Sequence, residues 1–343
     1  MPEREPDRID SPVLRPAGLD GALKAFHRES QVPGAEARAN RLRNVLRVDA
    51  PRGLPREPPR EHPAERLEQA RGLHRALPRL HLFELMDQPW WPAPLRDFST
   101  DYLHTISERM DIFEGAVSVL ARGLAAAESQ TVVDLCSGGT GPLPGLLRRL
   151  AAEYELEPRV VLTDLYPNEQ ARQKALRHGE RVEYLERPVD AMYVPEELKG
   201  LRTLFNAFHH FRPEQARAVL ADAQAKGAPI AVFEILERTP VGLLATLLMP
   251  LLVLGYAPQV RPRRVGRLAL TYLVPLNPLA VAWDGLVSTL RMYRPEELRE
   301  MTAALAREGY TWEVGRLCQP GKPGKPVVTY VLGLPMKQCA RQA

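Results

Sequence analysis

The chain has 343 residues and a formal net charge of +4, and its 45% hydrophobic and 26% charged residues indicate a folded globular protein and exclude a disordered or fibrous one. Its three cysteines, Cys136, Cys318 and Cys339, have neither the spacing of a disulfide framework nor that of a metal site. We therefore expect a protein of a reducing, cytoplasmic compartment that carries no metal.

Residues 1–80 differ from the rest of the chain because arginine and proline crowd them. They hold 16 Lys and Arg against 12 Asp and Glu, and this surplus of four equals the formal charge of the whole chain. The proline-rich stretch 52–63 predicts an extended segment between two amphipathic helices at 35–48 and 64–77. We predict a flexible N-terminal arm, with homodimerisation as one role. It has no apolar signal-peptide core, and so small a charge surplus does not predict nucleic-acid binding.

The segment Val132–Gly141 joins a hydrophobic run to a glycine-rich turn. The run predicts a parallel strand, and the turn leads into a helix that opens near Pro142, so a ligand would meet the amides at that helix's N-terminus. At the strand tip, Asp134 would repel the pyrophosphate of a dinucleotide but attract the ammonium and sulfonium groups of S-adenosylmethionine (SAM). The charge therefore favours a methyl donor as the cofactor.

A second strand-like run, Arg159–Leu165, contains Asp164, which lies 23 residues after Gly141. An acid at this spacing can accept hydrogen bonds from both hydroxyls of a ribose. With these two motifs in this order, residues 132–335 resemble the class I, Rossmann-like SAM-dependent methyltransferases. The family has a shorter loop, with a glycine where Cys136 stands. A nucleophilic role for Cys136 is less favoured than packing within the turn.

The resemblance implies an α/β fold with a doubly wound, mostly parallel seven-stranded sheet and an antiparallel last strand. The remaining strands are expected at 182–185, 202–208, 228–235, 310–317 and 327–334. In the family, the first acid and the glycine loop hold the methionine part of the cofactor, the second acid holds the ribose, and a third acid lies near the adenine. Asp190 is the third acid here, with turn capping as the alternative. The implied cofactor-binding residues are Asp134, Ser137, Gly138, Gly139, Gly141, Asp164, Leu165, Asp190, Ala191, Asn206 and Ala207.

The pair His209 and His210 follows the fourth predicted strand, whose carboxyl end faces the ligand cleft in such sheets. An imidazole can accept a proton near neutral pH, so either residue is a candidate general base that deprotonates the methyl acceptor. The alternatives are packing under the adenine and capping of the helix that starts at Pro213.

Related methyltransferases also cover their cofactor and substrate with helices that precede the first strand. Residues 81–130 are the corresponding helical cover, and Trp90, Trp91, Phe98 and Tyr102 are candidate aromatic walls of a substrate site. Packing in the hydrophobic core is the other interpretation of these side chains.

An insertion at 238–286 separates the fifth strand from the helix that opens at Pro295. It consists of two apolar blocks, 241–256 and 268–286, around the arginine-rich run 261–267. The first block has 16 residues, fewer than the ~20 that a bilayer span requires, so no transmembrane span is expected. The insertion is predicted to be a helical lid that packs on the sheet edge and forms an apolar pocket. Peripheral membrane contact through the arginines and dimer packing are the alternatives.

Asp284, Ser288 and Arg291 recur at helical spacing after this insertion. They can share one helix face, where Asp284 and Arg291 are candidate substrate contacts, or they can belong to a solvated, salt-bridged helix.

The sequence thus predicts methyl transfer from SAM to a small, largely apolar molecule by in-line displacement. The alternatives are a SAM-binding regulatory or scaffold protein without turnover and a methyltransferase of a membrane lipid or quinone. A nucleic-acid acceptor is disfavoured because Asn206 to His209 lack the proline-aromatic motif that holds a flipped base. The expected organisation is an arm at 1–80, a cover at 81–130, a core at 131–237 and 287–335, a lid at 238–286 and a tail at 336–343.

Overall fold

A computed structural model describes residues 77–138, 141–167, 169–261, 263–317 and 327–336. The predicted arm helices, the extended segment between them and the tail beyond residue 336 lie outside the described residues. The chain divides into two units, 1–54 and 55–343, and every described residue belongs to the second. That unit is described here by itself.

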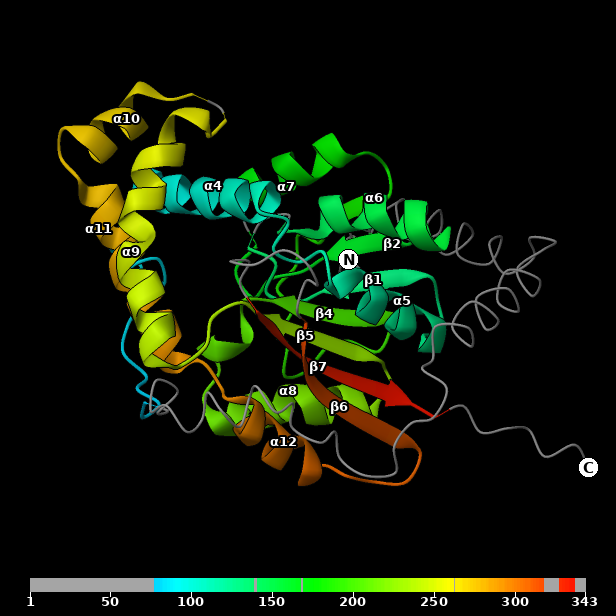
Figure 1. Ribbon diagram of the computed structural model, residues 1–343. Coiled ribbons are helices and arrows are strands. Elements are labelled where there is room, and N and C mark those ends of the chain that lie inside the picture. Colours follow the sequence, from blue (N-terminus) through cyan, green and yellow to red (C-terminus); the bar gives the residue numbers. More distant parts are fainter. Residues whose placement is uncertain (1–76, 139–140, 168, 262, 318–326, 337–343) are drawn as a thin grey trace, which may run out of the picture. The chain divides into compact units, whose positions relative to one another are not determined.

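A seven-stranded sheet with the order β3-β2-β1-β4-β5-β7-β6 organises the described chain (Figure 1). Strands β1 to β5 run parallel, and β7 pairs antiparallel with both β5 and β6. This is the predicted Rossmann-like sheet with an antiparallel last strand. The strands are β1 (Thr131–Asp134), β2 (Arg159–Leu162), β3 (Val182–Tyr184), β4 (Leu201–Phe205), β5 (Ile230–Glu234), β6 (Tyr310–Leu317) and β7 (Val328–Pro335).

Helices lie on both faces of the sheet (Figure 1), with α5 packed against β4, β5 and β7 and with α8 against β7. Prolines open α8 and α12 at the first helical position, where the missing N–H costs no intrahelical bond. The helices and 3₁₀ turns of the core and cover are α4 (Ala93–Arg109), α5 (Ala116–Ala126), α6 (Leu143–Tyr154), α7 (Glu169–Ala175), η1 (Leu176–His178), η2 (Phe208–His210), α8 (Pro213–Ala225) and α12 (Pro295–Ala303).

The central strands are apolar runs whose side chains are buried on both faces of the sheet. Every residue of β5 is buried, and so are Val132, Val133 and Asp134 of β1. Continuous apolar runs of this kind are typical of parallel strands that have helices on both sides. Parallel pairing places the carboxyl ends of β1, β2, β4 and β5 at one edge, where the loops that follow them meet.

The insertion forms three helices and a 3₁₀ turn: α9 (Pro240–Tyr256), η3 (Ala257–Gln259), α10 (Val265–Tyr272) and α11 (Leu276–Arg291). Its packing differs from the prediction of a lid on the sheet edge. Helices α9 and α11 pack along each other, and α11 also contacts α4 and η2. The expected boundary at residue 286 falls inside α11, because this helix runs on as one unit from the insertion to the core.

The first apolar block forms α9, which has 17 residues and differs from the expected bounds by one residue. Together with η3, α9 forms a 20-residue helical stretch, Pro240–Gln259, which is long and apolar enough to cross a membrane by length and composition. A bent pair, α10 and α11, passes the same test together with a 73° angle between its helices.

Candidate functional site

The loop after β1 has the left-handed backbone conformations that its glycines predict. Gly138 and Gly141 have φ values of 56° and 53°, and Cys136 has a φ of 56°. Cys136 therefore takes a backbone conformation that favours glycine, at a steric cost of roughly 1–2 kcal/mol. Gly139 lies outside the described residues.

Asp134 does not face this loop as a free carboxylate, which differs from the expectation of a direct contact with the cofactor. Its side chain is buried, its Oδ1 accepts a hydrogen bond from Thr203 Oγ1 at 2.7 Å, and its Oδ2 accepts one from Ser137 Oγ at 2.7 Å. Burial raises the pKa of Asp134 to about 7, although both hydroxyl groups act in the opposite direction. The acid at the tip of β1 thus links β4 to the loop.

Asp164 lies at the carboxyl end of β2 and is half-buried. Its Oδ2 accepts a hydrogen bond from Gly138 N at 2.9 Å, and its Oδ1 accepts one from Tyr166 N at 2.9 Å. Asp164 is therefore bound to the glycine loop, a contact that the sequence did not predict. A carboxylate oxygen can accept more than one hydrogen bond, so Asp164 can still bind hydroxyl groups.

Asp190 follows β3 and caps a turn, because its Oδ1 accepts a hydrogen bond from Met192 N at 2.8 Å. The loop that carries it is joined to the loop after β2, since Val189 N donates to Asp164 O at 2.9 Å. The structure therefore brings the second and third predicted acids to neighbouring loops.

The Cys136 thiol lies among these acids. Burial raises the pKa of this thiol, and the charges of Asp164, Asp134 and Asp190 raise it further. A thiol in such surroundings stays protonated, so the structure supports the packing role.

The other predicted cofactor residues have different surroundings. Leu165 is exposed, whereas Ala191 and Ala207 are buried and belong to the hydrophobic core. Asn206 directly follows β4 with a φ of 49°, and its Oδ1 accepts a hydrogen bond from Ile235 N at 3.0 Å. Asn206 therefore ties the ends of β4 and β5 together.

The two histidines form η2, immediately after β4, and Glu234 at the end of β5 fixes them. Glu234 Oε1 accepts hydrogen bonds from Phe208 N at 2.7 Å and from His209 N at 3.1 Å. Its Oε2 lies 2.9 Å from His209 Nδ1, which must be the donor because a carboxylate only accepts. His209 is 3% exposed, and its Nε2 has no hydrogen-bond partner. The arrangement is that of an imidazole oriented by a buried carboxylate.

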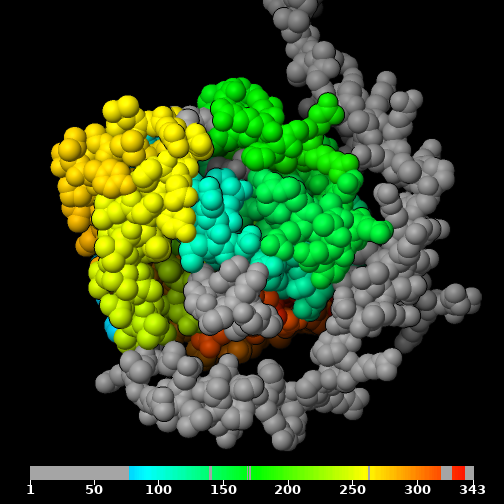
Figure 2. All heavy atoms as spheres, turned by 45° about the horizontal axis from the view of Figure 1, so that its top comes forward, coloured from blue at the N-terminus to red at the C-terminus, as the bar shows by residue number. Residues whose placement is uncertain are grey.

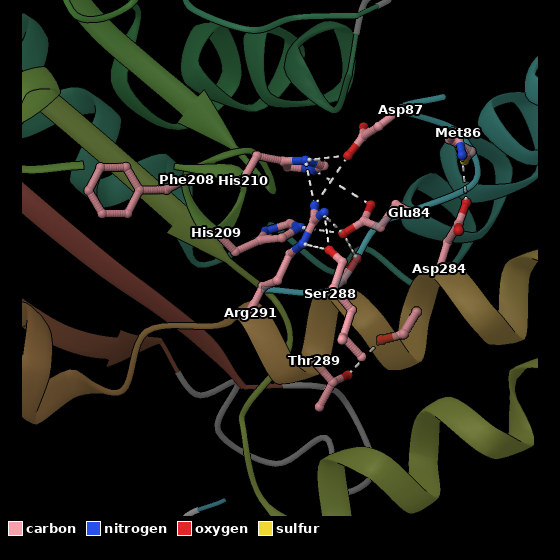
Figure 3. Close-up of polar contacts among 12 residues, drawn as sticks. Glu84, Met86, Asp87, Phe208, His209, His210, Asp284, Ser288, Thr289 and Arg291 are labelled. Atoms are coloured by element: carbon pink, nitrogen blue, oxygen red, sulfur yellow. Dashed lines mark hydrogen bonds and ion pairs between the residues drawn. The ribbon is translucent and has the colours of Figure 1, made fainter. Parts of the chain in front are cut away.

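His210 is more accessible, with 35% of its side chain exposed, and charged groups surround it (Figure 3). Its Nδ1 lies 3.3 Å from Asp87 Oδ2 and 3.2 Å from Arg291 Nη1, and its Nε2 lies 3.7 Å from Glu84 Oε2. Arg291 Nη1 in turn lies 3.0 Å from Glu84 Oε1 and 3.2 Å from Asp87 Oδ2. We call Glu84, Asp87, His209, His210, Glu234 and Arg291 the histidine cluster.

The two acids of the cover segment respond differently to this environment. Burial raises the pKa of Glu84, although His210 and Arg291 oppose the shift. Burial also acts to raise the pKa of Asp87, but hydrogen bonds and charge attraction from His210 and Arg291 outweigh it and lower the pKa to about 2. Asp87 is therefore ionised at neutral pH.

Asp284 and Arg291 share one face of α11, as predicted, but they bind the chain and not an open site. Asp284 Oδ1 and Oδ2 accept hydrogen bonds from Leu85 N at 2.6 Å and Met86 N at 3.1 Å, and Arg291 Nε donates to Leu82 O at 2.8 Å. Ser288, on the same face, donates to Glu84. These side chains thus form a clamp on residues 82–87, as in the alternative interpretation of a salt-bridged helix.

The predicted boundary of the arm at residue 80 is also wrong, because Arg79 belongs to the folded unit. Its guanidinium donates to the backbone oxygens of Arg291 at 2.7 Å, His209 at 3.1 Å and Phe211 at 2.9 Å. It also lies over the Tyr293 ring, 4.1 Å from the centroid. Arg79 thus fastens the start of the cover to η2.

Of the predicted aromatic walls, only the two tryptophans have accessible surface. Trp90 is exposed, Trp91 is half-buried, and their rings meet edge to face at 5.9 Å, three residues after Asp87. Tyr102 of α4 is buried and contacts no open site, and burial raises the pKa of its hydroxyl. Phe98 is buried as well. The core interpretation is therefore correct for Tyr102 and Phe98.

Part of the histidine cluster has the spacing of a metal site. Glu84, His209 and His210 offer ligand atoms that lie within 4.8 Å of one another, and a carboxylate with two imidazoles suits Zn²⁺ or Fe²⁺. Arg291, however, already donates to Glu84 from within the cluster. Because the guanidinium supplies positive charge there, we treat the cluster as an ion-pair network.

Four residues around the histidines were not predicted: Glu84, Asp87, Glu234 and Arg79. Glu234 had a signal, since it is the charged last residue of an apolar strand whose carboxyl end lies at the ligand edge. The others belong to a segment that contacts α11 although the two are more than 200 residues apart in the sequence. No local sequence pattern indicates a contact between segments so far apart.

Known proteins match this chain in structure but not in sequence. No family model and no curated protein sequence matches the chain. Among solved structures, the plantazolicin methyltransferase BpumL in complex with SAH is 12% identical with a TM-score of 0.44, covering 73% of this chain and 94% of that one. Human N-acetylserotonin methyltransferase in complex with SAM is 16% identical with a TM-score of 0.36, covering 69% and 56%. At these similarities, the function of this chain is inferred from its own residues.

Proposed function

We propose that this protein binds SAM and transfers its methyl group to a small, largely apolar molecule. The observation that carries the proposal is the gathering of three acids, Asp134, Asp164 and Asp190, around the loop that follows β1. This loop lies at the carboxyl edge of a doubly wound sheet, where ligands of such sheets bind.

The charge of this loop selects among nucleotide-type cofactors. A pyrophosphate would meet the carboxylates of Asp164 and Asp190, and like charges this close repel one another. SAM has no phosphate, and its ammonium and sulfonium groups are attracted to carboxylates. These two acids therefore favour SAM over NAD or FAD.

The chain offers a group for each part of this cofactor. Asp164 would bind the ribose hydroxyls, and Asp190 would lie near the adenine, beside the exposed Leu165. The backbone of the loop around Gly138 would lie against the methionine part. Asp134 acts through Ser137 and Thr203, which hold this loop in place.

Bound SAM supplies an electrophilic methyl group, and the protein has to position a nucleophile in line with it. His210 is the candidate general base for that nucleophile, because part of its ring is exposed while Asp87 and Arg291 hold it. His209 is a positioning residue, since it is buried and oriented by Glu234. Trp90 and Trp91 supply aromatic surface for an apolar acceptor next to the cluster.

A SAM-binding protein without turnover is the second candidate function. The observation that favours it is the engagement of the His210 ring by Asp87 and Arg291, which leaves the imidazole with existing partners. The two candidates predict different outcomes when the purified protein is incubated with SAM and pooled cell metabolites. Formation of S-adenosylhomocysteine supports methyl transfer, whereas tight binding of SAM with no product supports the second candidate.

A His210→Ala variant separates the role of the base from that of the fold. We expect its turnover to fall at least about tenfold while its affinity for SAM changes little, since general bases typically contribute 10²–10⁴-fold. His178→Ala is the matched control, because His178 lies in η1, away from the carboxyl ends of the strands. Unchanged turnover in His210→Ala would remove the general base from the proposal.

A further inference from the structure

Helix α9 is apolar around its whole circumference, yet most of it is uncovered. Only Thr246 and Val253 are buried, and they lie seven residues apart on the stripe that faces α11. The exposed side chains are large: Leu251, for example, is 63% exposed. A helix that is hydrophobic all round is normally buried in a protein core or in a membrane. Figure 2 shows α9 at the molecular surface.

The apolar surface continues onto the turn between α10 and α11. Val265 and Leu273 are 85% and 81% exposed, and Val274 and Leu279 are exposed as well. Tyr272, also exposed, adds an aromatic side chain of the kind enriched at membrane–water interfaces. We call this surface of α9, α10 and the start of α11 the apolar face, with the exposed residues Val241, Leu244, Leu247, Leu248, Leu251, Leu252, Leu254, Val265, Tyr272, Leu273, Val274, Leu276 and Leu279.

The charged residues between Arg238 and Asp284 have one sign. They include no Asp or Glu, whereas Arg261, Arg263 and Arg264 follow α9 and are exposed. The fourth arginine of the run, Arg267, is different, because it is buried and lies 2.6 Å from Asp101 of α4. The ion pair holds α10 against the cover, and the three exposed guanidinium groups remain at the surface.

The anchoring of α11 decides how this face can meet a bilayer. Asp284 and Arg291 bind residues 82–87 of the folded unit, so the end near them of the helical hairpin formed by α9 and α11 belongs to the aqueous domain. The arginines lie at the opposite end of α9, and insertion of the hairpin tip first would carry them into the hydrocarbon. Contact along the side of α9 avoids that cost and leaves the arginines at the depth of lipid phosphates.

We propose that the apolar face binds peripherally to a phospholipid bilayer that contains anionic lipid, with α9 lying in the plane of the interface. A surface of this kind, with leucines on one side and arginines beside it, matches the chemistry of an interfacial helix. A second copy of the chain is a poorer occupant, because it would bring another three arginines to the interface and no acid to pair with them. Methyl transfer is not required for this binding, so the two proposals fail independently.

Vesicle flotation with the full-length protein tests the proposal directly. The vesicles are pure phosphatidylcholine or phosphatidylcholine with 30% phosphatidylglycerol, and the variants are Leu244→Asp combined with Leu251→Asp, and Arg261, Arg263 and Arg264 all changed to Gln. Leu176→Asp is the matched control, since Leu176 of η1 is an equally exposed leucine outside the apolar face. Because every substituted residue is exposed, circular dichroism should show unchanged folding in each variant.

We expect the wild-type protein and Leu176→Asp to float with the anionic vesicles, and the double leucine variant to lose at least about nine-tenths of that binding. The triple arginine variant should lose the preference for anionic over neutral vesicles. The proposal is overturned when the wild-type protein fails to float with either vesicle. It is also overturned when light scattering shows a stable wild-type dimer that the double leucine variant dissociates while vesicle binding stays absent.

Discussion

Nδ1 of His209 lies 2.9 Å from Oε2 of Glu234, and this contact joins the turn after β4 to the end of β5. The other oxygen of Glu234 accepts the backbone N–H groups of Phe208 and His209. One buried carboxylate therefore fixes both the backbone of η2 and the orientation of an imidazole ring. The position of the adjacent His210 follows from the same contacts.

Glu234→Gln tests the importance of this link. An amide can replace only part of the acceptor capacity of the carboxylate, so η2 should loosen and the histidines should lose their orientation. We expect turnover to fall by about tenfold or more, with stability lowered by about 1–3 kcal/mol and with a dissociation constant for SAM within about threefold of the wild-type value. Turnover assays, urea denaturation and calorimetry measure these quantities, and Glu300→Gln on the exposed side of α12 is the control. Equal losses of SAM affinity and turnover would show that Glu234 acts through the cofactor loop instead.

Asp284→Ala tests the clamp between α11 and the cover. Both carboxylate oxygens accept backbone N–H groups, of Leu85 and Met86, and their loss leaves these donors unpaired. We expect faster hydrogen exchange at residues 82–87 and a loss of stability of about 1–3 kcal/mol. Asp284→Asn should show a smaller effect because its amide oxygen can still accept. Unchanged exchange in Asp284→Ala would mean that the segment is held by other contacts.

Much of the sheet could be predicted from the sequence, because its strands are apolar-rich segments that loops rich in glycine, proline and polar residues separate. β6 was predicted with the bounds that it has, Tyr310–Leu317, and the bounds of β7 differ by one residue. The acids Asp164 and Asp190 were located because each follows a strand whose carboxyl end lies at the ligand edge. Local pattern and topology together account for these positions.

The partners of the polar side chains could not be predicted in the same way. Helical spacing placed Asp284 and Arg291 on one face of α11, but it did not show that residues 82–87 would occupy that face. Likewise, the sequence shows that Asp134 precedes the glycines but not that Thr203 and Ser137 use both of its oxygens. Such pairings depend on contacts between distant parts of the chain.

The raised pKa of Asp134 predicts a pH dependence of stability. Its pKa is about 7 in the folded protein, against about 3.9 for an unperturbed aspartate, so the folded state holds the proton more tightly. The contribution of Asp134 to the free energy of unfolding is fully present below pH ~4 and is lost as the pH rises through about 7. Urea denaturation from pH 4 to 8 should show wild-type stability falling relative to Asp134→Asn, by on the order of 4 kcal/mol across the range. A constant difference between the two proteins would show that Asp134 has no such shift.

A chelator should leave turnover unchanged, because Arg291 supplies the positive charge beside Glu84 in the histidine cluster. Turnover is compared before and after dialysis against EDTA, with metal content measured in the same samples. Loss of activity that returns on addition of Zn²⁺ or Fe²⁺ would assign Glu84, His209 and His210 to a metal centre.

Calorimetric titration of SAM into the wild-type protein and into Asp164→Asn tests the central claim most directly. Glu180→Gln is the control, because Glu180 is exposed and precedes β3 at the opposite edge of the sheet. We predict that the wild-type protein and the control bind SAM with equal affinity, that Asp164→Asn binds it at least about tenfold more weakly, and that NAD does not bind. Absence of SAM binding to the wild-type protein, or unchanged affinity in Asp164→Asn, would contradict the assignment of this edge of the sheet as a SAM site.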